Sequence, residues 1–270
     1  MTPDRKDANL LLSTQGSDGV LRLTLNDPDR RNALSEAMLA ALDETFDAAS
    51  TNSDVRVIVL AAVGPVFCAG HDLKEMTTGR QNADRGRAYF TKILNQCSSF
   101  MQKIVTCPKP VIAEIGGVAT AAGCQLVASC DLAVASETAQ FCTPGVHIGL
   151  FCSTPMVALS RNLANKHAME MLLTGDMVSA SRAAEMGLVN QVVPSADLCA
   201  GSMALAAKIA AKSSLTIATG KRAFYQQKEM DLEAAYNYAS KTMVDNMLAR
   251  DAKEGIAAFI EKRVPDWRDE

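Results

Sequence analysis

The sequence changes its pattern about two thirds of the way along the chain, and this change constrains the fold more than any other feature. Before it, short apolar runs alternate with turn-rich and helical stretches, which is typical of α/β folds. After Pro194, the pattern is helical almost without interruption as far as Pro265. We therefore expect an α/β core over residues 1–195 and a helical region over residues 196–270, packed together without a low-complexity linker.

Individual elements of the core follow from local patterns. Leu10–Gln15 and Val20–Asn26, joined by a Gly-Ser-Asp-Gly turn, predict a β-hairpin. Ser35 is suited to cap the helix that follows. The segment Gly64–Leu73 is rich in turn-forming residues. Further strands are expected at 55–60, 111–115, 132–135 and 189–193, and further helices at about 84–105 and 121–128.

The composition excludes several classes of protein. The 270 residues are 48% hydrophobic and 21% charged, which argues against a disordered or collagen-like chain. A formal net charge of −3 gives no general attraction to nucleic acid, and the basic residues in 80–103 form no clear stripe. No apolar stretch reaches the roughly 18 residues that a membrane span needs. We expect neither a nucleic-acid partner nor a membrane partner.

The cysteines and the N-terminal segment bear on the cellular compartment. The chain has eight cysteines, none in C-x-x-C spacing, and most lie in apolar runs. They are expected to be buried, reduced thiols. The segment Met1–Asp7 and the short apolar run after it have the pattern of neither a signal peptide nor a transit peptide. We therefore expect a cytoplasmic location.

Several familiar catalytic motifs are missing from the sequence. It contains no G-x-S-x-G, H-E-x-x-H or G-x-x-x-x-G-K pattern, and its three histidines have no metal-binding spacing. We expect no metal and no separate cofactor. Two segments remain informative, Phe67–Leu73 and Ala119–Gln125, each of which follows an expected strand. Small residues at a helix start let a ligand approach free backbone N–H groups, and two such groups can form an oxyanion hole.

These segments resemble those of the crotonase superfamily, the enoyl-CoA hydratases and isomerases. The resemblance extends over about 250 residues, from the hairpin to the C-terminus. The residues around His71 and Gln125 resemble one subgroup of enoyl-CoA-hydratase-domain proteins in particular. The matching segments are Asn32–Leu34, Phe67–Met76, Lys109–Ala113, Ala121–Leu126, Cys130–Leu132, Leu173–Asp176, Ala183–Val189 and Phe259–Arg263.

The resemblance implies a crotonase-like spiral of ββα units, a helical trimerisation region at the C-terminus, and a homotrimer or a dimer of trimers. It implies an acyl-CoA thioester as substrate, with coenzyme A as part of that substrate. The backbone N–H groups of His71 and Ala122 would hold the thioester oxygen. The substrate-binding residues would be Arg30, Arg31, Ala33, Ala69, His71, Asp72, Leu73, Lys74 and, from a neighbouring subunit, Phe259 and Lys262.

The sequence departs from the family at both catalytic glutamates. Hydratases of this family use two glutamates for general acid–base catalysis. Gln125 stands at the position of one, and an amide cannot act as a base near neutral pH. Gly145 stands at the position of the other, and Phe151–Pro155 replaces the glycine-rich stretch that follows it in hydratases. These differences argue against efficient hydration of the standard, two-glutamate type.

Other residues near the expected pocket are candidates for the lost acid–base function. His71 and His147 are potential bases, and Cys68, Cys124 and Cys152 are potential thiolates. For each of these side chains, ordinary packing is the competing interpretation. The sequence does not show where the nearest acids, Glu114 and Asp131, point.

Three functions stay open at this point. The first is an enzyme of the enoyl-CoA hydratase/isomerase type, a lyase by class, that stabilises a thioester enolate. The second is a non-catalytic protein that binds acyl-CoA and has lost the glutamates. The third is a different reaction on the same fold, such as thioester hydrolysis, decarboxylation or dehalogenation.

Overall fold

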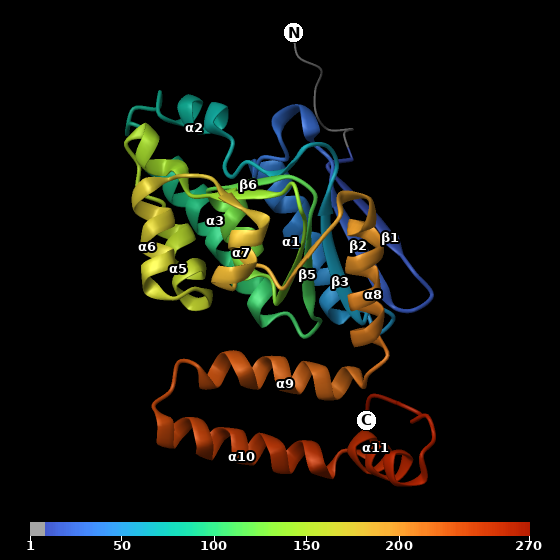
Figure 1. Ribbon diagram of the computed structural model, residues 1–270. Coiled ribbons are helices and arrows are strands. Elements are labelled where there is room, and N and C mark those ends of the chain that lie inside the picture. The colour runs from blue at the N-terminus through green and yellow to red at the C-terminus, as the bar shows by residue number, and fades with distance from the viewer. Residues whose placement is uncertain (1–8) are drawn as a thin grey trace.

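The computed structural model describes residues 9–270 and contains a six-stranded and a four-stranded sheet (Figure 1). The larger sheet has the order β1-β2-β3-β5-β7-β10, with an antiparallel hairpin at one edge and parallel strands beyond it. Its strands are β1 (Leu11–Gln15), β2 (Val20–Leu25), β3 (Val57–Ala62), β5 (Val111–Ile115), β7 (Leu132–Ser136) and β10 (Gln191–Val193).

The central strands of this sheet are buried on both faces, which explains their continuous apolar sequences. In β3, Ile58 and Leu60 face the main core, whereas Val57 and Val59 face a second apolar cluster under α8 (Leu198–Ala210). Alternate residues of a strand point to opposite faces, so a single run of β-branched residues serves both layers.

The smaller sheet was not expected from the sequence. It has the order β4-β6-β8-β9. Its strands are only two or three residues long, which is too short for a periodic pattern to emerge. They are β4 (Val66–Cys68), β6 (Val118–Thr120), β8 (Gln140–Cys142) and β9 (Val178–Ser179). The segment Gly64–Leu73, expected as a turn, therefore contains one strand and leads into a short helix, α2 (Leu73–Gly79).

The helices of the core cover both sheets. Ser35 caps α1 by accepting a hydrogen bond from the Met38 N–H, as expected. α1 packs against α3, with the rings of Phe46 and Phe100 edge to face at 5.1 Å. The helices before residue 195 are α1 (Glu36–Thr51), α2 (Leu73–Gly79), α3 (Arg87–Thr106), α4 (Ala122–Ser129), α5 (Ser153–Asn162), α6 (Asn165–Thr174) and α7 (Ala180–Met186), with short 3₁₀ helices η2 (Pro28–Arg30) and η3 (Pro144–Ile148).

The C-terminal part is helical, as the sequence predicts, but its first helix belongs spatially with the larger sheet. After η4 (Ser195–Asp197), α8 packs on the sheet through the second apolar cluster. The remaining helices form a separate layer beside the core (Figure 1), namely α9 (Ser214–Gln227), α10 (Leu232–Leu248) and α11 (Arg250–Glu261). The boundary at residue 195 therefore marks a change of pattern, and as a domain boundary it stays a prediction.

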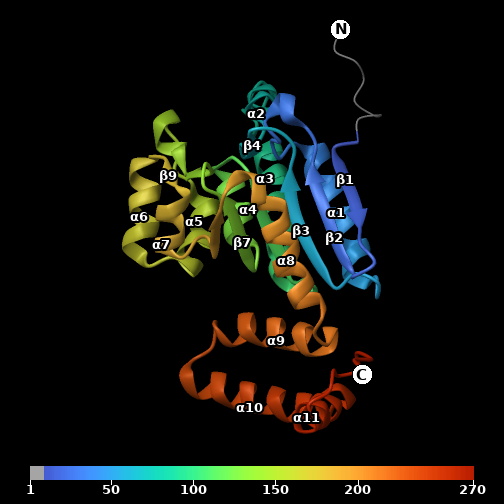
Figure 2. The same ribbon diagram turned by 45° about the vertical axis from the view of Figure 1, so that its right-hand side comes forward.

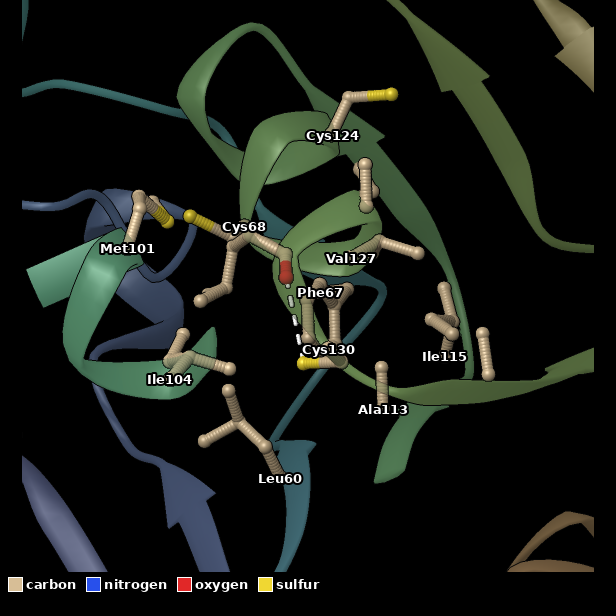
Figure 3. Packing of buried hydrophobic residues seen from close by; sticks show 14 of the residues in the cluster. Leu60, Phe67, Cys68, Met101, Ile104, Ala113, Ile115, Cys124, Val127 and Cys130 are labelled. Carbon is tan, nitrogen blue, oxygen red and sulfur yellow. Dashed lines mark hydrogen bonds between the residues drawn. The ribbon is translucent and has the colours of Figure 1, made fainter. Parts of the chain in front are cut away.

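The remaining expectations can be compared with the structure directly. Seven cysteines are buried, and Cys68 and Cys130 lie among apolar side chains (Figure 3). The expectation is wrong for Cys199, which is exposed in the first turn of α8. No helix within residues 9–270 is long and apolar enough to cross a membrane. The segment Met1–Asp7, on which the leader-peptide prediction rests, lies outside the described residues.

Candidate functional site

Two glycines bring the two informative segments into contact. A Cβ atom on Gly123 would lie 2.1 Å from the Cys68 carbonyl oxygen, so only glycine fits there. Gly70 has φ +84, and a Cβ on it would lie 3.0 Å from the Ala122 nitrogen. These close approaches place the chain after β4 directly against the start of α4.

The backbone N–H groups of His71 and Ala122 are available at this junction. Leu34 N–H donates to the Gly70 carbonyl at 2.8 Å in an isolated bridge, and this bond leaves the His71 N–H unused. Ala122 is the first residue of α4, so its N–H has no acceptor within the helix. Within residues 9–270 neither N–H has a hydrogen-bond partner. The predicted pair is thus free to bind an oxygen atom, and its role stays a prediction.

The backbone at the start of α4 is strained. Ala121 has φ 50 and ψ −119, a conformation that residues with a Cβ rarely adopt. It is held there by the hydrogen bond from its N–H to the Cys142 carbonyl at 3.0 Å. Such strain is often found at binding sites, where surrounding contacts maintain it.

A second strained turn supports the other side of the junction. Arg31 and Asn32 both have positive φ, at 56 and 50. The buried Asn32 amide fixes this turn, since its Nδ2 donates to the Val63 and Val66 carbonyls at 2.9 and 2.7 Å. The Ala69 N–H in turn donates to the Arg31 carbonyl at 3.0 Å. The turn and the Ala69–His71 segment are therefore one hydrogen-bonded unit.

An ion pair connects the predicted phosphate-binding turn to α2. Arg30 Nη1 lies 3.0 Å from Asp72 Oδ2. The buried Asp72 carboxylate also caps α2, accepting from the backbone N–H groups of Lys74 and Glu75. Asp72 is thus a structural link between two predicted CoA-binding segments. Arg31 has an exposed side chain that makes no ion pair within the described part of the chain.

The other predicted substrate-binding residues fall into two groups. Ala33 is buried and Ala69 half-buried beside the junction, whereas Leu73 and Lys74 are exposed in the first turn of α2. Phe259, which is 85% exposed, and Lys262 lie at the end of α11. In both ribbon views α11 and α2 lie at opposite ends of the molecule (Figures 1 and 2). One chain therefore does not bring these two residues to the junction.

Gln125 and His71 carry unpaired polar atoms. Gln125 is 4% exposed, and its Oε1 is buried without a hydrogen-bond partner in the described chain. The same holds for Nδ1 and Nε2 of His71. Burial lowers the pKa of the His71 ring, and the adjacent Leu34 backbone offsets this only in part. The ring is therefore neutral near pH 7.

The position of the second family glutamate is closed. A Cβ on Gly145 would lie 2.8 Å from the Leu150 carbonyl oxygen and 2.9 Å from Cys152 Sγ. The Leu150 N–H also donates to the Gly145 carbonyl at 2.9 Å, which fixes this loop against η3. The sequence showed that the carboxylate was missing, but not that its space was occupied.

The remaining acid–base candidates are poorly placed or weakly ionised. His147 is exposed, and its Nε2 lies 2.9 Å from the Thr174 carbonyl, which joins η3 to α6. Burial raises the pKa of Cys68 to about 12 and raises that of Cys124 further. It also raises the pKa of Cys152, so none of the three thiols ionises readily near neutral pH.

The resemblance implies an α/β spiral, and the structure has one, with α4 starting at a strained junction lined by glycines. Comparison with known proteins establishes the class of protein. The family model for enoyl-CoA hydratase/isomerase matches residues 15–270. The chain therefore belongs to this family. The predicted crotonase-like fold with a helical C-terminal region is confirmed, as is the resemblance to the subgroup.

Individual relatives place the chain within that family. The mouse protein named enoyl-CoA hydratase domain-containing protein 3, mitochondrial, is 49% identical over 95% of this chain and 84% of its own length. The crystal structure of an enoyl-CoA hydratase from Mycobacterium smegmatis matches with TM-score 0.91 and 51% identity, covering 96% of this chain and 99% of that one. The crystal structure of human enoyl Coenzyme A hydratase domain-containing protein 3 matches with TM-score 0.90 and 46% identity. This match covers 96% of this chain and 100% of that one.

These names correct one prediction. The mouse, rat and human relatives, at 48–49% identity, are all named as mitochondrial proteins. The expectation of a cytoplasmic location is therefore wrong. It rested on the missing leader pattern and on reduced thiols, and reduced thiols do not distinguish the cytosol from other reducing compartments.

Proposed function

We propose that the protein binds an acyl-CoA thioester and holds its carbonyl oxygen with the backbone N–H groups of His71 and Ala122. Membership of the enoyl-CoA hydratase/isomerase family supports a CoA thioester as ligand. The observation that carries the proposal is the pair of free N–H groups at the junction that Gly70 and Gly123 make possible. Preorganised donors of this kind stabilise negative charge that develops on a carbonyl oxygen.

The rest of the ligand would follow the polar and basic groups around the junction. Arg31 and Arg30, which is also paired with Asp72, would provide positive charge near the CoA phosphates. Leu73 and Lys74 would lie along the CoA arm. Phe259 and Lys262 would come from a neighbouring subunit of a trimer or a dimer of trimers, which agrees with their distance from the junction in one chain. No separate cofactor is needed.

Hydration by two carboxylates does not fit this site. Water addition to an enoyl thioester needs one group to activate the water and another to deliver a proton to the α-carbon. Gln125 has no ionisable proton, and the space beside Gly145 is filled by Leu150 and Cys152. We infer stabilisation of an enolate-like thioester without efficient hydration of the standard type. The second candidate is a binding role without turnover, which Gln125 and Gly145 also favour because neither supplies a carboxylate.

A pair of ligands tests the N–H pair without changing the protein. Butyryl-CoA and its thioether analogue S-butyl-CoA differ at the carbonyl group, and only the thioester can accept both N–H bonds. We expect butyryl-CoA to bind about tenfold more tightly or better in calorimetry, because two hydrogen bonds are lost in the thioether complex. Equal affinities would refute the role of the N–H pair. Mass spectrometry of the incubated thioester then distinguishes hydrolysis, decarboxylation and simple binding.

A further inference from the structure

One side chain joins the two segments that carry the free N–H groups. The Thr120 hydroxyl donates a hydrogen bond to the Ala69 carbonyl at 3.0 Å. Ala69 directly follows β4 and Thr120 is the last residue of β6, so this bond connects two neighbouring strands where they end. His71 lies two residues after Ala69, and in the same way Ala122 follows Thr120. Each N–H donor is therefore two residues from one end of this bond.

The backbone pairing of β4 with β6 is short and irregular. Its register pairs are Val66 with Val118 and Cys68 with Ala119, and the register shifts between them. An irregularity of this kind disrupts the ladder locally and bends the strand that carries the extra residue. The Thr120 hydroxyl bond lies one step beyond the last of these pairs, on the side of the N–H groups. A side chain thus extends the connection that this short ladder provides.

The strained residue of the site lies directly after this bond. Ala121, at φ 50 and ψ −119, keeps its conformation only if the surrounding structure holds it. Its own N–H donates to the Cys142 carbonyl at 3.0 Å, and the hydroxyl bond fixes the residue before it. The Ala122 N–H belongs to the planar peptide unit that follows Ala121, so any rotation about ψ of Ala121 turns that N–H. The direction of this donor therefore depends on how firmly Ala121 is held.

We propose that Thr120 is a positioning residue whose hydroxyl keeps the N–H groups of His71 and Ala122 directed at one oxygen atom. The inference rests on the proposed binding of a CoA thioester by this N–H pair, and it adds the side chain that sets the geometry of the pair. Two donors stabilise one oxygen only when both point at it, because hydrogen bonds weaken steeply as their angle departs from linear. Thr120 acts through the backbone and needs no contact with the ligand.

A second threonine of the same layer distinguishes positioning from a purely structural role. The Thr143 hydroxyl donates to the Met171 carbonyl at 2.8 Å, which joins the chain after β8 to α6. Thr120→Val and Thr143→Val each remove one hydroxyl-to-carbonyl bond and keep a branched side chain of similar size. The two variants are therefore matched in chemistry, and only Thr120→Val removes a bond between the segments that carry the N–H donors.

The first readout is the ratio of the affinities for butyryl-CoA and S-butyl-CoA in isothermal titration calorimetry. We expect this ratio to be about tenfold or more in the wild type, because only the thioester accepts both N–H bonds. Thr120→Val should lower it to about threefold or less, while the thioether binds within about twofold of its wild-type affinity. Thr120→Ser restores the hydroxyl and should recover most of the ratio. Thr143→Val should keep the wild-type ratio even where its melting temperature falls.

The second readout is the infrared carbonyl band of bound butyryl-CoA labelled with ¹³C at its carbonyl carbon. Hydrogen bonds to the oxygen lower the frequency of this band, and we expect a smaller lowering in Thr120→Val than in the wild type. A wild-type ratio and band in Thr120→Val, with folding verified by circular dichroism, would overturn the proposal. An equal loss of the ratio in Thr143→Val would overturn it as well, because the effect would then be general. A wild type that binds both ligands equally would instead refute the N–H pair, and with it the role of Thr120.

Discussion

Two regions of this molecule treat their buried polar side chains in opposite ways. In the polar anchors, defined here as Glu114 and Asp131 with their partners, every carboxylate oxygen is hydrogen-bonded. At the candidate site, His71 and Gln125 have buried atoms without partners. The contrast separates polar groups that hold the fold together from polar groups that are available to a ligand.

Glu114 anchors α8 to the larger sheet. Its carboxylate forms an ion pair with Arg22 at 2.5 Å and accepts a hydrogen bond from the Ser202 hydroxyl at 2.5 Å. Asp131 anchors α9, because it accepts from Lys221 Nζ at 2.6 Å and from the Tyr225 hydroxyl at 2.9 Å. These two acids, the nearest to the site in sequence, are therefore engaged in structure.

The largest expected effect is the loss of an anchor. Asp131→Ala leaves the Lys221 ammonium buried, with only the Ile104 and Lys109 carbonyls as partners. Breaking a buried ion pair from one side costs about 3–5 kcal/mol, so the free energy of unfolding should fall by that order in urea titrations. The control is Glu185→Ala, which breaks the exposed pair with Arg182 and should cost less than about 1 kcal/mol. Equal costs would erase the distinction between anchors and surface pairs.

The next effect concerns the closed glutamate position. Gly145→Ala should destabilise the protein by about 1–3 kcal/mol, because the added methyl meets the Leu150 carbonyl and Cys152 Sγ. Gly220→Ala on α9 is the control, since a Cβ there has no atom within 4 Å and helix propensity favours alanine. Thermal melts compare the two variants.

The same crowding predicts that restoring the family glutamates does not restore hydration. The double variant Gln125→Glu with Gly145→Glu should show no gain in crotonyl-CoA turnover over Gln125→Glu alone, because the loop must move before the second carboxylate fits. A stable double variant with a clear gain would mean that this position is open.

A smaller effect of the opposite sign is expected at Gln125. Gln125→Met removes a buried acceptor that has no partner, so the ligand-free protein should be as stable as the wild type or more stable by about 1 kcal/mol. Ser202→Ala, which removes a satisfied hydroxyl in the Glu114 anchor, should instead lower the free energy of unfolding by about 1 kcal/mol. Denaturant titration of both variants without ligand is the check, and a loss at Gln125 equal to that at Ser202 would contradict the contrast.

The smallest effect is a pH dependence from His71. Because burial lowers the pKa of this ring in the folded state, the unfolded chain binds its proton first as the pH falls below about 6.5. The folded state therefore loses stability as the pH falls from the ordinary histidine pKa toward the lowered one. It regains that stability as the pH rises through the same interval. Urea titrations from about pH 5 to 8 should show a flatter profile for His71→Gln than for the wild type. If the stability profiles of the two proteins run parallel, the pKa of the His71 ring is not lowered on folding, which would contradict its apolar surrounding.

Much of this arrangement was predictable, because it depends on local sequence. The hairpin, the Ser35 cap and the strand at 111–115 follow from turn residues, capping chemistry and an apolar run. The small residues of the two motif segments indicated a backbone that a ligand can approach, but not the contact between the two segments. Their contact depends on the fold, but the residues that permit it can be identified in the sequence.

The parts that could not be predicted depend on contacts between distant residues. The strand at 66–68 is too short to show a period and exists because β6 lies beside it. The crowding of Gly145 comes from a loop five residues later that folds back, which no local pattern encodes. The pairing of Asp131 with Lys221 joins positions 90 residues apart, and only such long-range pairing distinguishes a structural acid from a catalytic one.

The most direct test of the account is the hydration of crotonyl-CoA by the wild-type protein, measured alongside calorimetric binding of butyryl-CoA to the same preparation. Loss of the conjugated enoyl absorbance is followed against a mock purification from the same host. The account predicts saturable thioester binding with hydration no faster than in the control. Robust, saturable hydration that purifies with the protein would contradict it, because another acid–base pair would then have to replace the missing carboxylates.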